Sequence, residues 1–147
     1  MKKGKKVLIV EDEEVIRKVL RLNLSKWGFE VEEAEDGLLA LAKLGKEPYA
    51  LIICDIVMPN MDGWELIRQV KRNPNTQDIR IIALTSRDKD SDVWKGYELG
   101  ADYYITKPFT TAQLRYGLQM ILDQSTDESS KDVNVIDLSR QFESEDS

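Results

Sequence analysis

Short apolar runs alternate along the chain with longer segments in which apolar residues recur every three or four positions. The run at 49–54 is continuously apolar, as expected for a strand buried on both faces of a parallel sheet. Runs of this kind predict five strands, at residues 5–10, 29–34, 49–54, 79–84 and 102–105.

Helical periodicity fills the intervals between these strands. One pattern begins at Val15 and ends near Gly28, and a second is stopped by Gly45 and Pro48. Further patterns place helices around residues 66–70, 93–99 and 114–122. Five alternating β/α units predict a parallel sheet with right-handed crossovers and helices on both faces.

Polar side chains occur where the predicted strands end, at the edge of an open α/β sheet where ligands bind. They are Glu11, Asp12, Asp55, Thr85, Ser86 and Lys107. Each has an ordinary structural explanation by itself, since Asp12 could cap a helix and Lys107 could be a surface lysine. Their convergence at one edge instead predicts an oxygen-rich pocket for a hard cation.

Composition narrows the class of protein. The 147 residues are 41% hydrophobic and 33% charged, which is typical of one soluble globular domain. One cysteine and no histidine exclude an internal disulfide, a Cys/His zinc site and phosphohistidine chemistry on this chain. No apolar stretch approaches the ~20 residues of a membrane span. The apolar run that follows the basic start, residues 7–10, is too short for the core of a signal peptide. We therefore expect a cytoplasmic protein with no membrane association.

The net charge of −6 is concentrated at the end of the chain. Residues 125–147 carry seven acidic and two basic side chains, which leaves the remainder nearly neutral. That remainder has no basic face or aromatic platform for nucleic acid. We expect a domain over residues 4–124, followed by a disordered acidic tail over 125–147. Val135, Leu138 and Phe142 recur near helical spacing, so a short tail segment could instead fold on a partner.

Several motifs together resemble the receiver domain of two-component response regulators, in particular the stand-alone receivers of chemotaxis. They are VLIVEDE at 7–13, Asp55 followed by Met58-Pro59 and Gly63, ALTS at 83–86, GAD at 100–102 and KPF at 107–109. The resemblance implies a flavodoxin-like, doubly wound (βα)5 fold. Its five-stranded parallel sheet would have the strand order 2-1-3-4-5.

The resemblance also assigns roles at the strand ends. Asp55 is the expected phosphoacceptor, which takes its phosphoryl group from a phosphohistidine of a histidine kinase or phosphotransfer protein. Asp12, Asp55 and the backbone carbonyl of Val57 are the expected Mg²⁺ ligands, with Glu11 acting through water. Lys107 would contact the acceptor carboxylate before transfer and the phosphoryl oxygens afterwards.

Two further residues are expected to carry the output. Thr85 would donate its hydroxyl to the phosphoryl oxygen, and Tyr104 would then turn inward as an aromatic switch. A plain strand-end tyrosine remains the alternative, because Tyr103 lies beside it.

The resemblance implies two protein partners as well. Helix one would meet the phosphodonor, with Ile16, Arg17, Leu20 and Trp27 as candidate contacts. The helix 4–strand 5–helix 5 face would meet a downstream protein target. A homodimer of the phosphorylated chain is a further possibility.

Position 57 carries an additional expectation. An apolar Val57 cannot orient an attacking water, so we expect slow self-dephosphorylation. The chain would catalyse its own phosphorylation and dephosphorylation without being a conventional enzyme.

The same residues bear on other functional classes. A haloacid-dehalogenase phosphatase would need a second Asp where Val57 stands. A phosphate-independent pseudo-receiver and a receiver fragment of a longer regulator remain the alternatives, although pseudo-receivers usually lack the acidic pair, the acceptor or the lysine.

Overall fold

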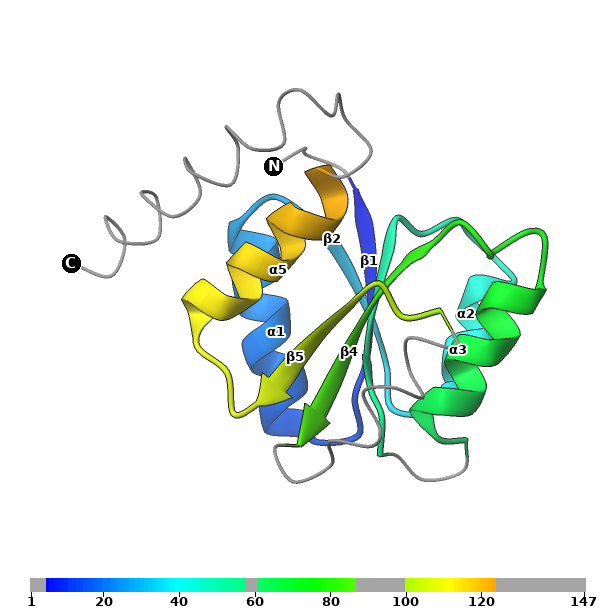
Figure 1. Cartoon of the computed structure of the whole chain (residues 1–147), viewed down its shortest axis with the longest axis horizontal. Helices are drawn as coiled ribbons and strands as arrows, with labels where there is room; N and C mark the ends of the chain where they lie inside the picture. Colours follow the sequence, from blue (N-terminus) through cyan, green and yellow to red (C-terminus); the bar gives the residue numbers. More distant parts are fainter. Residues whose placement is uncertain (1–4, 58–60, 87–99, 124–147) are drawn as a thin grey trace. The chain divides into compact units, whose positions relative to one another are not determined.

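The computed structural model describes residues 5–57, 61–86 and 100–123 (Figure 1). The chain divides into two compact units, residues 1–107 and residues 108–147, and each is described by itself. The first unit contains all five strands and the helices α1, α2 and α3, and the second contains α5.

Five strands form one parallel sheet in the order β2-β1-β3-β4-β5, which confirms the predicted fold class and strand order. They are β1 (Lys6–Val10), β2 (Glu30–Ala34), β3 (Leu51–Asp55), β4 (Arg80–Ser86) and β5 (Tyr103–Lys107). The last three strands extend one or two residues beyond the predicted ends. The ladder continues through the pairs Asp55–Leu84 and Ser86–Lys107, so these polar residues close the strands instead of following them.

The described helices agree with the periodic patterns in the sequence. They are α1 (Glu14–Lys26), α2 (Gly37–Leu44), α3 (Gly63–Arg72) and α5 (Thr111–Asp123). The helix predicted around 93–99 lies outside the described residues. Asp36 and Asp62 cap α2 and α3, each accepting a backbone N–H at 2.9 Å. The N-cap of α1 is Glu13, which makes no capping bond through its side chain, so Asp12 is not used as a helix cap.

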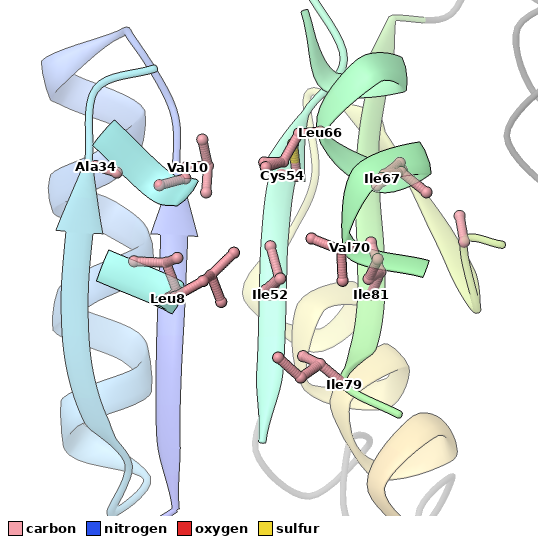
Figure 2. Packing of buried hydrophobic residues seen from close by; sticks show 14 of the residues in the cluster. Leu8, Val10, Ala34, Ile52, Cys54, Leu66, Ile67, Val70, Ile79 and Ile81 are labelled. Carbon is pink, nitrogen blue, oxygen red and sulfur yellow. The ribbon is translucent and has the colours of Figure 1, made fainter. Parts of the chain in front are cut away.

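The hydrophobic core of the first unit lies on both faces of the sheet. α1 lies against one face, and α2 and α3 cover the other (Figure 1). On the second face Leu8, Ile52 and Ile81 from three neighbouring strands belong to one buried cluster with Leu66 and Val70 of α3 (Figure 2). All five residues of β3 are buried, as its continuous apolar run predicts. β1 and β3 are therefore fixed at the centre of the sheet, and their ends are fixed with them.

The Gly100-Ala101-Asp102 motif holds the starts of β4 and β5 together. The Asp102 carboxylate accepts the backbone N–H of Ile81 at 2.7 Å, and Lys71 donates to the carbonyl of Ile79 at 2.8 Å. Gly100 has φ +116°, and a Cβ there would lie 2.7 Å from the Lys71 side chain. This motif has a structural role at the amino ends of the strands, opposite to the carboxyl ends where the acids lie.

In the second unit, α5 begins with a reciprocal cap. The hydroxyl of Thr110 accepts the backbone N–H of Gln113 at 3.0 Å, and the Gln113 side chain accepts the N–H of Thr110 at 2.9 Å. Leu114, Leu118 and Ile121 are buried at helical spacing. Across the described parts of both units, no helix is long and apolar enough to cross a membrane.

Candidate functional site

Two carboxylates lie side by side at the ends of the central strands. Val10 of β1 is the register partner of Cys54 of β3, and an acid comes next in each case: Glu11 just after β1, and Asp55 as the last residue of β3. Glu11 is completely buried and Asp55 is 5% exposed. Burying two negative charges is unfavourable unless cations or hydrogen-bond donors lie nearby.

Lys107, the last residue of β5, supplies a positive charge to both acids. Its Nζ lies 3.1 Å from Oδ2 of Asp55 and 3.0 Å from Oε1 of Glu11. Burial alone would lower the pKa of Lys107, but its contact with Glu11 and the charge of Asp55 outweigh that effect, so the pKa is raised. Lys107 is therefore held as an ammonium between the two acids.

Glu11 is the acid whose ionisation these surroundings oppose. Burial, together with the nearby charge of Asp55, raises the pKa of Glu11 to about 7. Its Oε2 accepts the backbone N–H of Glu13 at 3.1 Å, which ties the carboxylate to its own loop. The single ammonium of Lys107 thus does not compensate the negative charge of the acids around it.

A third carboxylate completes a possible cation site. Asp12 is exposed, and oxygen atoms of Glu11, Asp12 and Asp55 all lie within 4.8 Å of one another. Mg²⁺ is a hard cation that prefers carboxylate oxygens and retains several waters, so one exposed and two buried carboxylates suit it. The donor set and its excess negative charge therefore fit a divalent cation.

The loop after β3 holds Asp55 through the backbone. The N–H of Val57 donates to Oδ1 of Asp55 at 3.2 Å, while the Val57 side chain is 61% exposed. The N–H of Gly63 donates to the carbonyl of Ile56 at 2.8 Å. A Cβ on Gly63 would lie 2.7 Å from Cα of Ile56 and closer still to the carbonyl oxygen of Asp55. The motif glycine is thus required for close approach, whereas Met58 and Pro59 lie outside the described residues.

The two predicted switch residues lie on the neighbouring strands. Thr85 is 4% exposed and comes one residue after Leu84, the register partner of Asp55. Tyr104 is half-buried, pairs with Ala83 and packs against the hydrophobic core of the α2–α3 face. Thr85 is thus on β4, next to the Asp55 strand β3, and Tyr104 is on β5, one strand further away.

The surface of α1 differs from the expected docking contacts. Leu20 is completely buried and cannot meet a partner, and the Arg17 side chain is only 13% exposed. The exposed apolar residues of α1 are Val15, Val19 and Leu22, at 74%, 42% and 61%. They follow one another at helical spacing and form an apolar stripe on the outside of α1.

One set of contacts around the acids was missed by the sequence reasoning. Arg17 donates from Nη1 to the carbonyl of Glu11 at 2.9 Å and from Nε to the Glu33 carboxylate at 2.9 Å. Glu33 lies opposite Ile9 in the β1–β2 register. Because Glu33 is far from Arg17 along the chain, the strand register was the signal that could have found this pair.

Comparison with known proteins agrees with this geometry. Residues 7–119 match the family model of the response regulator receiver domain. The chain belongs to the response regulator receiver family. Receiver domains generally bind Mg²⁺ at an acidic pocket, and Glu11, Asp12 and Asp55 form the corresponding cluster here.

The curated relatives are longer than this chain. The chain is 39% identical over 122 residues to the alkaline phosphatase synthesis transcriptional regulatory protein PhoP of Bacillus subtilis, covering 83% of this chain and 50% of PhoP. It therefore spans about half the length of the curated relatives it matches.

Solved receiver structures match nearly over their full length. The chemotaxis protein CheY4 of Vibrio cholerae has a TM-score of 0.76 at 35% identity, covering 80% of this chain and 98% of that one. The receiver domain of the sensor histidine kinase PA1611 of Pseudomonas aeruginosa has a TM-score of 0.75 at 30% identity, covering 81% and 98%. In that Pseudomonas structure a magnesium ion is coordinated in the active-site cleft.

The Gly63 contact predicts a large difference between two glycine substitutions. Gly63→Ala should lower the free energy of unfolding by about 1–3 kcal/mol, because the new methyl group must displace the backbone of Asp55 and Ile56. Gly45→Ala is the matched control, since a Cβ there would lie 3.6 Å or more from its neighbours. Urea unfolding measures both variants, and equal stability would contradict the close approach at Gly63.

Proposed function

We propose that this receiver accepts a phosphoryl group on Asp55 from a phosphohistidine of a histidine kinase or phosphotransfer protein, with Mg²⁺ as cofactor. The observation that carries the proposal is the buried Asp55 carboxylate, 3.1 Å from the Lys107 ammonium and grouped with two further acids. The Mg²⁺-bound receiver of Pseudomonas aeruginosa supports the choice of metal.

In the proposed reaction an oxygen of Asp55 attacks phosphorus. The O–P bond forms as the N–P bond to the donor imidazole breaks, and the departing imidazole nitrogen keeps the electron pair and is protonated. The Val57 N–H and Lys107 hold the carboxylate from two sides, which fixes its approach to phosphorus. After transfer, Lys107 would contact the phosphoryl oxygens.

Mg²⁺ would be held by Asp12, Asp55 and the Val57 carbonyl, with Glu11 acting through water. When bound, the ion neutralises charge on the transferring phosphoryl oxygens. Glu11 has a second task, because its buried carboxylate faces Lys107 at 3.0 Å and helps to fix the ammonium. These assignments use the acids in the cluster and the backbone of the loop that follows Asp55.

The proposed output depends on Thr85 and Tyr104. A phosphoryl group on Asp55 would give the buried Thr85 hydroxyl an oxygen to bind, drawing it toward the acceptor. The half-buried Tyr104 would then turn inward and change the helix 4–strand 5–helix 5 face, where a downstream protein target would bind. A phosphorylated homodimer could use the same surface.

The donor would dock on the apolar stripe of α1, formed by Val15, Val19 and Leu22. These exposed residues follow directly after the loop that carries Glu11 and Asp12, so a bound donor would lie near the acids. Exposed apolar residues in a row favour protein contact over solvent. We retain the domain boundary at residues 4–124 and the tail at 125–147 as part of the proposal.

The proposed function makes a first prediction of its own, about the acceptor. With acetyl phosphate and Mg²⁺, the wild-type chain should gain one acid-stable, hydroxylamine-labile phosphate, and Asp55→Asn should gain none, because an amide cannot form the acyl phosphate. Intact-protein mass spectrometry measures the added mass. Asp78→Asn, which changes an exposed carboxylate in the α3–β4 loop, serves as the control and should label normally. Equal labelling of Asp55→Asn and wild type would refute the assignment.

The second prediction concerns the lifetime of the phosphate. The exposed Val57 side chain cannot hydrogen-bond an attacking water, so phosphate should leave slowly from the phosphorylated chain. Val57→Asn should hydrolyse about fivefold faster, since one hydrogen bond of about 1 kcal/mol can orient the water. Release of inorganic phosphate measures both rates, and faster release from wild type than from Val57→Asn would overturn the argument.

The third prediction separates donor docking from chemistry. Val19→Asp should slow transfer from a phosphorylated histidine phosphotransfer protein about tenfold, because it places a charge in the centre of the apolar stripe. Acetyl phosphate needs no docking surface, so its rate should be unchanged. Leu38→Asp on α2, also an exposed apolar position, is the control and should affect neither donor. A parallel loss with both donors would place Val19 outside the docking surface.

A further inference from the structure

The cluster of acids is held in place by an arginine that does not touch the acid oxygens. Arg17 lies in the first turns of α1, and its side chain is 13% exposed. Its Nη1 donates to the carbonyl of Glu11 at 2.9 Å and approaches that of Asp12 at 3.5 Å. Its Nε donates to the Glu33 carboxylate at 2.9 Å. One guanidinium therefore links α1, the acidic loop and β2.

These two carbonyls belong to the peptide groups on either side of Asp12. When both peptide planes are fixed, the φ and ψ angles of Asp12 are fixed, and so is the direction of its Cα–Cβ bond. Among the described residues no hydrogen bond or ion pair fixes the Asp12 carboxylate itself. The backbone is thus the means by which this exposed acid is aimed toward Glu11 and Asp55.

Glu33 gives the arginine a partner away from the acids. Its two carboxylate oxygens receive Arg17 at 2.9 Å and Arg21 at 3.0 Å. A guanidinium without such a partner would pair with the nearest carboxylates, and there it would compete with a cation for the same oxygens. Arg21 is 60% exposed and pairs with Glu33, and within the described part of the chain it makes no hydrogen bond or ion pair to the acidic loop.

We infer that Arg17 is a positioning residue for the divalent cation site, which orients Asp12 through the backbone while Glu33 keeps the guanidinium away from the acid oxygens. The inference rests on the proposed Mg²⁺ binding of this receiver. Residues that orient metal ligands from outside the coordination sphere change metal affinity by about 10–100-fold when they are replaced. Arg17 has this position relative to Asp12.

The sign of the effect separates positioning from simple electrostatics. If Arg17 acted only as a nearby positive charge, Arg17→Met would remove repulsion and tighten Mg²⁺ binding. If Arg17 orients Asp12, the same change weakens Mg²⁺ binding, by about tenfold. Arg21→Met removes an equal charge and an ion pair to the same Glu33, so it is the matched control, with Mg²⁺ affinity unchanged.

Calorimetric titration with Mg²⁺ alone tests the inference, with urea unfolding and circular dichroism to verify the fold of each variant. Phosphorylation by acetyl phosphate supplies a second readout. For Arg17→Met, the Mg²⁺ concentration at half-maximal rate should rise about tenfold, whereas the rate at saturating Mg²⁺ should stay near that of wild type. The Mg²⁺ affinities of Arg17→Lys and Glu33→Gln should lie between those of wild type and Arg17→Met. In Arg17→Lys the reason is that one ammonium cannot reach both partners of the guanidinium. These two variants decide the question should Arg17→Met not fold.

The failures are distinguishable. Absence of Mg²⁺ binding and of phosphorylation in wild type would refute the proposed function itself. Normal binding in wild type with unchanged or tighter binding in the Arg17 variants would refute only the positioning role. Equal weakening in Arg17→Met and Arg21→Met would also refute it, because the effect would then come through Glu33 alone.

Discussion

An excess of buried negative charge at the end of the central strands is the constraint on which this site depends. Glu11 and Asp55 cannot move apart, because β1 and β3 are hydrogen-bonded neighbours whose side chains are buried on both faces. Lys107 lies within about ion-pair distance of both acids, but a single ammonium cannot neutralise two buried carboxylates and the exposed Asp12 beside them. Burial first, and then the charge of Asp55, raise the pKa of Glu11 to about 7, in agreement with this imbalance. A divalent cation at this cluster would relieve it.

The loops around the acids are held mainly by their backbones. Val57 donates its N–H to Asp55, Gly63 donates to Ile56, and Arg17 binds the carbonyl of Glu11. Contacts of this kind fix where the side chains begin and leave carboxylate oxygens available for a cation and a phosphoryl group. They also explain why glycine is needed at position 63, where a methyl group would meet the backbone of Asp55 itself.

The strands and the acidic residues at their ends could be predicted from the sequence. The contacts that hold the acidic loop in place could not. Apolar runs gave the five strands, and Asp55 and Lys107 differ from the prediction only in closing β3 and β5 instead of following them. Glu33 could not be found in this way, because its partner Arg17 is brought near by the β1–β2 register and not by local spacing. The sequence pattern also could not predict which apolar residues of α1 are buried. Leu20 and Val19 are adjacent, yet Leu20 is buried and Val19 is exposed. Helix packing decides that difference, and periodicity alone leaves its phase uncertain by about one residue.

The position of each proposed residue in the sheet suits its role. Asp55 ends β3, which has a hydrogen-bonded strand on each side, so the proposed nucleophile has little freedom to move. Lys107 and Tyr104 belong to β5, which is paired only with β4 in the described sheet. An edge strand gives up fewer backbone hydrogen bonds when it shifts than a central strand does. A new phosphoryl group on Asp55 would pull on Lys107, and β5 can follow more easily than β3. The proposed chemistry is thus attached to the centre of the sheet, and the proposed response to one of its edge strands.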